Sequence, residues 1–413
     1  MYSKEQRSGK IETAIRNDPV VSSEAMQDAR PAICIVVAAA MTIEVFLLEQ
    51  IAALMPLYQV TVVANCPDKK HLRKFGLDLD IQHVPMCRDI APLQDLKCLF
   101  RLFLLFRARN FAVVHSITPK AGLLSMVGAV LARVPLRVHT FTGQVWATTA
   151  GWKRAGLKSL DRILAMSATH ILADSRSQLK FLAEEGVVKE HRADVLGSGS
   201  ISGVDIKRFQ PRQEEKWRIR RVLDIPDSAT VFGFIGRIKK DKGVLDLARA
   251  FGLLPISGPK AYLIIAGPDE ENLTRKMIEL SGGSADRIRF VSWTQTPEFY
   301  MTAFDLLCLP SYREGFGSVI IEAAACGVPT LASRIYGISD AVVDGVTGML
   351  HESGDVAAIA AGMKRALDEP EFVKEMGRRA QNRARTEFSS ARLSAELVGF
   401  YSGILSGAQK SGG

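Results

Sequence analysis

The chain has 413 residues, of which 47% are hydrophobic and 23% charged, and its formal net charge is +9. This length suits two domains of ordinary size, and the composition excludes a fibrous or wholly disordered protein. The six cysteines are scattered without a Cys-x-x-Cys pair, which favours reduced thiols over disulfides or zinc. The first apolar run, at 33–41, is too short and begins too late for a signal peptide, so we expect a buried strand there.

The first half of the chain alternates short β-branched runs with helical patterns. Residues 1–30 precede this pattern, are polar and lack periodicity, so we expect a disordered extension. The strands expected after it are 33–37, 60–64, 112–116, 136–141 and 170–173. The helices expected between them are 43–55, 93–109, 121–132 and 157–167. This alternation predicts βαβ units and a parallel sheet with helices on both faces.

The second half repeats the pattern. Its expected strands are 230–235, 261–266, 288–291, 306–309 and 330–332, and its clearest helices are 243–254, 272–280, 318–326 and 355–367. Between the halves, residues 197–203 are rich in glycine and serine, which indicates a boundary near residue 205. We therefore expect two doubly wound, Rossmann-like α/β domains at 31–205 and 206–385, and a C-terminal helix at 386–413 that crosses back to the first domain. Ligands should bind between them, at the carboxyl ends of the strands.

The strongest local signal is the segment 310–329, in which a strand, a glycine-bearing loop and a helix follow one another. The helix is expected to begin near Gly317 and to stop at Gly327. Its N-terminus would point away from the sheet, where free amides and the helix dipole favour an anion. Glu314 precedes this helix and could reach a polyol such as a sugar. Glu322 lies in an apolar stretch of the helix, so it should accept hydrogen bonds, for example from a ribose diol.

A second signal is the loop from Gly236 to Gly243. It carries Arg237, which can bind phosphate oxygens bidentately, and Lys242, which adds a point charge. A basic loop of this kind is also common on solvated surfaces. Its place in the same domain as Glu314 favours a joint phosphate site, although the P-loop pattern is absent.

Together these motifs resemble a known family. Gly236-Arg237 and Lys242-Gly243, followed by Glu314-Gly-Phe-Gly and Glu322 eight residues on, are similar to the retaining GT-B glycosyltransferases of the Glu-x7-Glu family, that is, glycosyltransferase group 1 or family 4. The resemblance extends from about residue 31 onward. It implies a GT-B fold, in which two Rossmann-like domains face each other across a cleft.

The resemblance also implies roles for single residues. Arg237 and Lys242 would neutralise the donor diphosphate and Glu314 would contact the transferred sugar, so these three are the expected catalytic residues. The other donor-binding residues that it implies are Gly236, Gly315, Phe316, Gly317, Ser318 and Glu322. It implies no cofactor and no metal ion, because the nucleotide sugar is a substrate and the cations supply the electrostatic stabilisation.

The segments expected to bind the acceptor match the family pattern less closely than the donor loops do. The segment 115–122 resembles the subset of the family that builds bacterial surface polysaccharides, and the residues expected on the acceptor side are Thr118, Lys120, Thr142 and Gly143. Many relatives have a histidine in a Thr-x-His-Gly segment where this chain has Thr142. We therefore expect His139 to point elsewhere and assign it no role. The Asp78-Leu-Asp80 pair has the spacing of metal-dependent glycosyltransferases, but we expect no further carboxylate or histidine to share a metal ion with it and therefore assign it no metal role.

The positive charge is localised. Between residues 96 and 162 there are eleven lysines and arginines but a single acid, Asp161. The stretch 96–109 is apolar, aromatic and basic at helical spacing, and 153–162 is a second basic stretch. Anionic lipid headgroups would suit them, and so would a polyprenyl-diphosphate-linked saccharide. The alternative for 96–109 is a core helix with solvated basic residues. No nucleic-acid-binding motif accompanies the charge.

The leading hypothesis is a hexosyltransferase that moves a sugar from a UDP-sugar to a lipid-linked saccharide in bacterial surface polysaccharide synthesis. UDP is implied by the resemblance alone. Such an enzyme would work in the cytoplasm, peripherally bound to the inner face of the membrane. One alternative is a nucleotide-sugar epimerase of the same architecture, and another is a non-catalytic basic binding protein.

Overall fold

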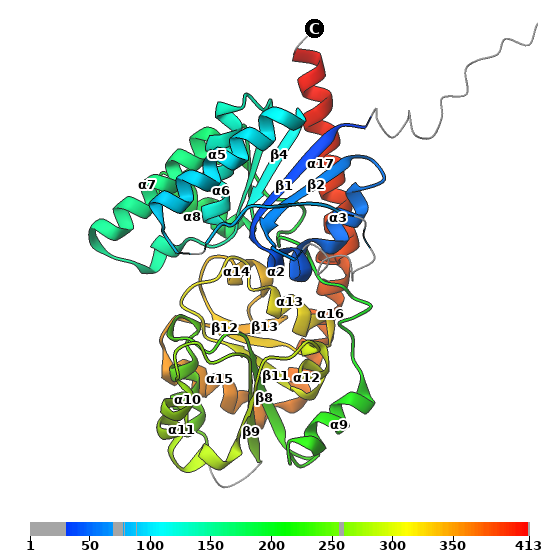
Figure 1. The fold of residues 1–413 in the computed structure, drawn as a ribbon. Helices are drawn as coiled ribbons and strands as arrows, with labels where there is room; N and C mark the ends of the chain where they lie inside the picture. The colour runs from blue at the N-terminus through cyan, green and yellow to red at the C-terminus, as the bar shows by residue number, and fades with distance from the viewer. Residues whose placement is uncertain (1–29, 69–76, 78, 88, 256–259, 412–413) are drawn as a thin grey trace, which may run out of the picture.

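A computed structural model describes residues 30–68, 77, 79–87, 89–255 and 260–411. The chain forms two halves, each built on one parallel sheet covered by helices, as Figure 1 shows. The expected doubly wound α/β class is thereby confirmed. The expected extension at 1–30 lies outside the described residues except for Arg30.

The N-terminal sheet has seven strands in the order β3-β2-β1-β4-β5-β6-β7. Their bounds are Ala32–Ala39, Gln59–Asn65, Asp80–His83, Val113–Ile117, Leu136–Phe141, His170–Ala173 and Ala193–Asp194 for β1 to β7. The central strand β1 pairs in parallel with both β2 and β4, so that Ile33 lies between Val60 and Val113. The β-branched runs that predicted these strands are buried on both faces of the sheet. The short edge strands β3 and β7 were not predicted.

Helices cover both faces of this sheet. One face carries α5 (Pro92–Arg109), α6 (Pro119–Leu131), α7 (Gly151–Ser167) and α8 (Arg176–Glu184), whose apolar residues form a core with the sheet. The other face carries α3 (Leu48–Leu54) and the C-terminal helix α17 (Ser390–Ser411). The single helix predicted at 43–55 was wrong in detail, because α2 (Ala40–Thr42) and a π-helical turn at Ile43–Leu47 precede α3.

The C-terminal sheet has six strands in the order β10-β9-β8-β11-β12-β13. Their bounds are Thr230–Ile235, Ala261–Ala266, Ile288–Val291, Leu306–Leu309, Thr330–Ser333 and Gly348–His351 for β8 to β13. The helices around it are α9 (Gln213–Val222), α10 (Val244–Gly252), α11 (Thr274–Ser281), α12 (Pro297–Ala303), α13 (Ser318–Ala325), α14 (Ile338–Ala341), α15 (Val356–Asp368) and α16 (Pro370–Glu387). A cluster of fully buried aromatic and aliphatic side chains forms its core.

The chain passes between the halves at two adjacent points. The Val204 amide donates to the Phe388 carbonyl at 2.8 Å, and the Ser390 amide donates to the Val204 carbonyl at 2.9 Å. Beyond the second crossing, α17 packs against α3 on the N-terminal half. Its Tyr401 is fully buried and its hydroxyl lies 2.6 Å from Nδ1 of His115 on β4. The C-terminal helix is thus part of the core of the N-terminal half.

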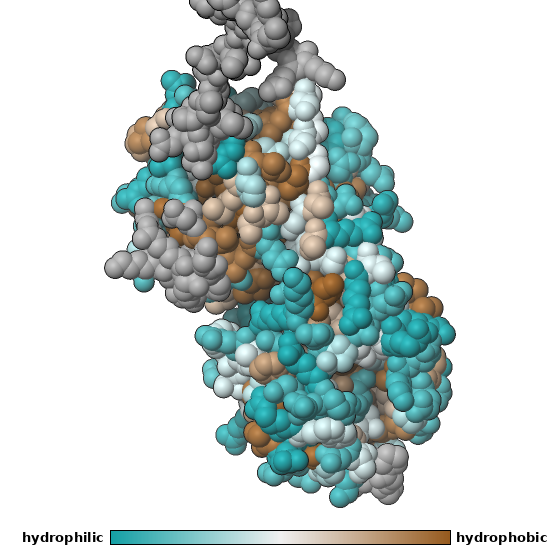
Figure 2. Space-filling view, turned by 90° about the vertical axis from the view of Figure 1, so that its right-hand side faces the viewer, coloured by the Kyte–Doolittle hydropathy of each residue, from teal (hydrophilic) through white to brown (hydrophobic). Residues whose placement is uncertain are grey.

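The two halves differ in hydropathy on the face that carries α3 and α17 (Figure 2). Figure 2 looks onto the side of α3 and α17: hydrophobic residues gather on the N-terminal half, whereas most of the C-terminal half is hydrophilic. Within the described part of the chain, no helix is both long and apolar enough to cross a bilayer.

Candidate active site

The loop between β11 and α13 is shaped by glycine. Gly317 has φ 74° and ψ 52°, a left-handed conformation that favours glycine, and it directly precedes the first residue of α13. No side chain caps this helix. The amides of its first turn therefore remain available for an anion, as the sequence predicted for this helix.

The loop between β8 and α10 packs directly on the α13 loop. Gly243 has φ 68°, and a methyl group at its Cα would lie 2.0 Å from the Pro310 carbonyl oxygen. On the other side, a methyl group at Gly267 would lie 2.0 Å from the carbonyl oxygen of Gly236. Only glycine allows these close approaches of one backbone to another. Three loops from the carboxyl ends of β8, β9 and β11 thus meet at one place.

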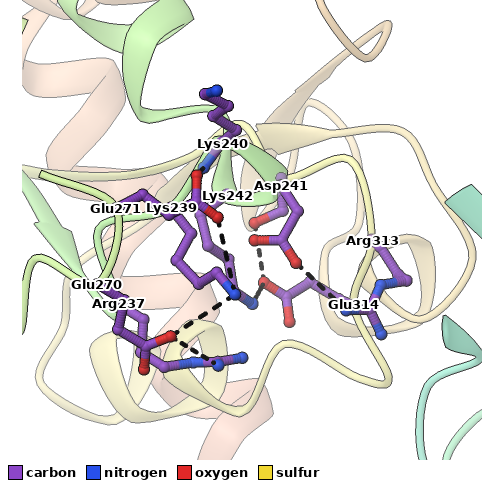
Figure 3. A network of polar contacts seen from close by, with 10 residues as sticks. Arg237, Lys239, Lys240, Asp241, Lys242, Glu270, Glu271, Arg313 and Glu314 are labelled. Atoms are coloured by element: carbon purple, nitrogen blue, oxygen red, sulfur yellow. Dashed lines mark hydrogen bonds and ion pairs between the residues drawn. The ribbon is translucent and has the colours of Figure 1, made fainter. Parts of the chain in front are cut away.

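This packing joins the two motifs that the sequence singled out. Nζ of Lys242 lies 2.6 Å from Oε1 of Glu314, and Oγ of Ser311 donates to the same carboxylate oxygen at 2.8 Å, as seen in Figure 3. The Lys242 and Glu314 side chains are 16% and 13% exposed. An ion pair so little exposed is screened weakly, so the lysine is fixed in place beside the N-terminus of α13.

Two other cations of the basic loop, Arg237 and Lys239, are also paired with carboxylates. Arg237 Nη1 lies 3.3 Å from Glu270 Oε2, and Lys239 Nζ lies 3.6 Å from the same oxygen. Arg313, in the α13 loop, pairs with Asp241 at 3.2 Å. Figure 3 shows these cations converging on one region of the loop cluster. A diphosphate bound there would exchange partly exposed carboxylate partners for phosphate oxygens.

Glu322 lies one helical turn deeper in α13 and is partly buried. Burial raises its pKa to about 7, while Arg208 opposes this shift and Glu298 adds to it. Arg208 is itself bound to the buried Glu298 at 2.9 Å. Among the described residues no group donates a hydrogen bond to the Glu322 carboxyl. Its oxygens are therefore available to the hydroxyls of a ligand.

Phe316 and Ser318 complete the predicted donor set. The Phe316 ring is 2% exposed and packs against Phe388 at a centroid distance of 5.4 Å. The Phe316 side chain therefore stabilises the loop. Ser318 is the first residue of α13 and is partly buried.

Two of the four residues predicted on the acceptor side lie against the α13 loop. A methyl group at Gly143 would lie 3.3 Å from the Gly315 amide nitrogen. One at Gly315 would lie 3.1 Å from the Thr142 carbonyl oxygen. The N-terminal half thus touches the α13 loop through the end of β5.

The other two acceptor-side residues are not brought to this loop by any contact among the described residues. Thr118 has φ 76° and ψ 142°, a conformation that is costly for a residue with a Cβ atom, and its hydroxyl is buried without a partner in the described part of the chain. Lys120 is bound to Asp95 at 2.6 Å and donates to the Asp89 carbonyl, so it anchors the start of α5.

The buried histidines serve the fold. His139 points toward α6, away from the cleft, as expected: its Nδ1 lies 2.8 Å from Ser116 Oγ. A methyl group at Gly122 would lie 2.5 Å from its Cε1. Burial lowers the pKa of both His139 and His115 to about 3, so both rings are neutral.

The Asp78-Leu-Asp80 pair lies partly outside the described residues, since Asp78 is not among them. Asp80 pairs with Arg109 and accepts a hydrogen bond from Thr61 Oγ1 at 2.9 Å. Within the described ranges, no group of three or more histidines, cysteines or acids is placed to hold a metal ion.

Sequence reasoning missed the residues that join the halves. Asp174 follows β6 and its Oδ2 would lie 3.0 Å from a methyl group at Gly315. Ser177, at the start of α8, bonds to Asp340 and accepts from the Gly337 amide at 2.7 Å. The available signal was position: Asp174 is a carboxylate at the carboxyl end of a predicted strand, where ligands of α/β folds bind.

Comparisons with known proteins agree with this geometry. The model of the glycosyl transferase 4-like domain matches residues 42–199, and that of glycosyl transferases group 1 matches residues 215–383. The capsular polysaccharide biosynthesis glycosyltransferase CapM of Staphylococcus aureus is 32% identical over 82% of this chain and 88% of its own length. The Escherichia coli UDP-Gal:α-D-GlcNAc-diphosphoundecaprenol α-1,3-galactosyltransferase is 26% identical over 76% of this chain and 81% of its own length.

Solved structures share the fold. Anabaena HepE in complex with UDP superposes with a TM-score of 0.74 at 18% identity, covering 90% of this chain and all of HepE. WaaG, a glycosyltransferase involved in lipopolysaccharide biosynthesis, superposes with a TM-score of 0.69 at 14% identity, covering 89% of this chain and 99% of WaaG. The two facing sheets, the paired loops and these relatives together place the chain in the group 1 family of GT-B glycosyltransferases, and it is an enzyme that uses a nucleotide sugar as donor.

Proposed function

We propose that the protein transfers a sugar from a UDP-sugar, with retention at the anomeric carbon, to a lipid-linked saccharide in bacterial surface polysaccharide synthesis. The observation that carries the donor side is the pairing of Lys242 with Glu314 beside the N-terminus of α13. The acceptor class is supported by the E. coli relative, whose name gives a diphosphoundecaprenol-linked substrate. UDP is supported by the same name and by the complex of HepE with UDP.

In this mechanism the bond between the sugar C1 and the diphosphate oxygen breaks, and the acceptor oxygen bonds to C1 from the same face. The acceptor proton passes to the leaving diphosphate. Arg237, Lys242 and the amides from Gly315 to Ser318 stabilise the negative charge that develops there. Glu314 orients the sugar and is held by Lys242, while Glu322 accepts from the ribose. We propose no metal cofactor, because these groups supply the positive charge themselves.

We propose that the N-terminal half also binds the inner surface of the cytoplasmic membrane. Helices α5, α6 and α7 pack side by side and form one side of this half in Figure 1. Helix α5 buries Cys98, Leu102 and Phe106 in the core, as the alternative interpretation required. It also exposes a second apolar face, formed by Leu93 (81% exposed), Leu96, Phe100 and Leu104.

Helix α7, on the other side of α6, also exposes large apolar side chains, among them Trp152 (86% exposed) and Met166 (71% exposed). Exposed cations lie among these apolar side chains, at Lys97, Arg101, Lys153 and Arg162. Apolar residues that enter the headgroup region, flanked by cations that attract anionic lipids, are the composition of an interfacial membrane contact.

The transfer itself is tested with a panel of radiolabelled nucleotide sugars, each incubated with and without bacterial membrane lipid extract. Label in the lipid fraction is the expected result, and chelation of divalent ions should leave its rate unchanged. Isomerised nucleotide sugar in the absence of lipid would instead identify an epimerase. If neither product forms although UDP binds, a non-catalytic binding role replaces both.

The membrane contact is tested separately by co-sedimentation with vesicles. Wild type should bind vesicles that contain phosphatidylglycerol, bind neutral vesicles weakly, and lose binding at high salt. Trp152→Ala combined with Phe100→Ser should abolish binding. The matched control is Trp293→Ala, which removes a tryptophan that is 59% exposed on the other half. Equal binding of both variants would exclude the α5–α7 surface.

A further inference from the structure

The turn between β6 and α8 is a second place where the N-terminal half meets the loop between β11 and α13, here called the donor loop. Ser175 caps α8 by accepting from the Gln178 amide at 3.1 Å. Two residues later, the Ser177 amide donates to Asp340 at 3.2 Å, and its hydroxyl accepts from the Gly337 amide. These bonds fix the turn against the C-terminal half.

The side chain of Asp174 is enclosed in this junction. It is only 4% exposed, and its Oδ1 has no hydrogen-bond partner among the described residues. Its Oδ2 faces Gly315, where a methyl group would lie 3.0 Å away. The backbone around it is fixed, because its amide donates to Gln178 Oε1 at 2.8 Å and its carbonyl accepts from the Ser200 amide at 2.6 Å. The carboxyl group is therefore almost fully buried and lies against the donor loop.

Among the described residues, no cation forms an ion pair with the Asp174 carboxyl group. From the N-terminal half, Asp174 shares a small cavity with Gln50 of α3, His115 of β4, Thr140 of β5 and Ser200. Of these only His115 titrates, and it is neutral. From the C-terminal half, Glu314 lies next to Gly315 but is turned to Lys242, and Asp340 is bound to Ser177. Arg313 is held by Asp241.

We propose that Asp174 is a positioning residue that acts through Gly315. In its protonated, neutral form it holds the donor loop against the N-terminal half. Closure of the two halves over the donor is therefore coupled to the uptake of one proton. The place of Asp174 in donor binding rests on the proposed function. The proton linkage of the contact between the halves does not, because it follows from burial of an unpaired carboxyl group.

The direction of the effect follows from linkage. Burial raises the pKa of Asp174 to about 8, whereas in an opened junction the carboxyl returns to the ordinary value of about 4. Closure is therefore unaffected by pH below the lower value, and weakens by up to about tenfold per pH unit between the two values. Above the higher value it falls no further. Asp174→Asn keeps the shape and the neutral state, and removes this dependence.

The experiment compares wild type, Asp174→Asn and Asp174→Ala, with Asp194→Asn as the matched control. Asp194 is an exposed carboxylate on the neighbouring strand β7. Without ligand, small-angle scattering should show a larger radius of gyration for wild type at about pH 8.5 than at about pH 6, and no change for Asp174→Asn. The ratio of the UDP Kd of wild type to that of Asp174→Asn should rise over the same range, by about threefold to a hundredfold. The titration of UDP itself cancels in this ratio.

Asp174→Ala distinguishes the effect of the side chain's contact with the donor loop from the effect of its charge. It removes the group that touches the loop, so it should bind UDP more weakly than Asp174→Asn already at low pH, whereas Asp194→Asn should follow wild type throughout. Equal pH profiles of wild type and Asp174→Asn would overturn the proposal. If Asp174→Asn fails to fold, a radius of gyration of wild type that does not change with pH overturns it equally. Absence of UDP binding at every pH would refute the proposed function, while the scattering result still decides the proton linkage.

Discussion

Replacing Lys242 by alanine removes the cation that the structure fixes beside the donor loop. The lysine lies 2.6 Å from Glu314, and both side chains are more than four-fifths buried. Its loss leaves the Glu314 carboxylate with one hydrogen bond from the described residues, donated by Ser311. Breaking a fully buried pair in this way costs about 3–5 kcal/mol, and the remaining access to solvent reduces this to about 1–3 kcal/mol here. The loss of one group that stabilises developing charge lowers kcat by about a hundredfold to a thousandfold.

The assay measures initial rates of label transfer and the free energy of unfolding for Lys242→Ala, Glu314→Gln and the double variant. The double variant should be destabilised by less than the sum of the single changes, because no unpaired charge is left in it. The control is Lys364→Ala, which breaks an exposed pair with Asp368 on α15. The assigned donor site is refuted if both single variants keep near-normal transfer rates, or if the control loses as much activity as they do.

Three further predictions concern single residues. Gly243→Ala should abolish UDP binding in calorimetry and lower Tm, because its methyl group would lie 2.0 Å from the Pro310 carbonyl oxygen; retained binding would show that the two loops can separate. Glu322 has a raised pKa of about 7, so its ionisation costs stability as pH rises from the ordinary carboxyl value. Glu322→Gln should therefore be more stable than wild type by up to about 3 kcal/mol in denaturant titrations above this pKa and similar at low pH, yet bind UDP more weakly. Tyr401→Phe removes the hydrogen bond to His115 and should cost about 1–3 kcal/mol of stability while the UDP Kd stays unchanged; an altered Kd would connect α17 to the donor site.

Much of the fold was readable from the sequence because buried parallel strands leave continuous β-branched runs. Strands such as Thr230–Ile235 and Leu306–Leu309 were predicted to the residue. The strands that were missed, Asp80–His83, Ala193–Asp194 and Gly348–His351, lie at sheet edges. The first two are partly exposed, which permits polar residues and weakens the pattern. The third is mostly buried but contains no β-branched residue, so no strand pattern marks it.

The donor loops were predictable because glycine, cations and a helix start are local signals. The carboxylates that pair with the cations of these loops could not be predicted. Glu270 and Asp241 bind cations of the site, but the sequence distance between partners carries no pattern. The contact of Asp174 with the donor loop joins segments about 140 residues apart and depends on how the halves meet, which only the folded chain determines.

The two adjacent crossings of the chain, at Val204 and Ser389, have a practical consequence for engineering. Because α17 completes the core of the N-terminal half, a chain cut after residue 205 would leave the groove that receives Tyr401 open to water. A chimera that takes its N-terminal half from a relative should therefore receive two segments of that relative together. These are the segment that corresponds to the chain up to residue 204 and the helix that corresponds to the chain after residue 389. The C-terminal half between the two crossings then forms a single insert into this N-terminal half, and the two ends of the insert lie side by side.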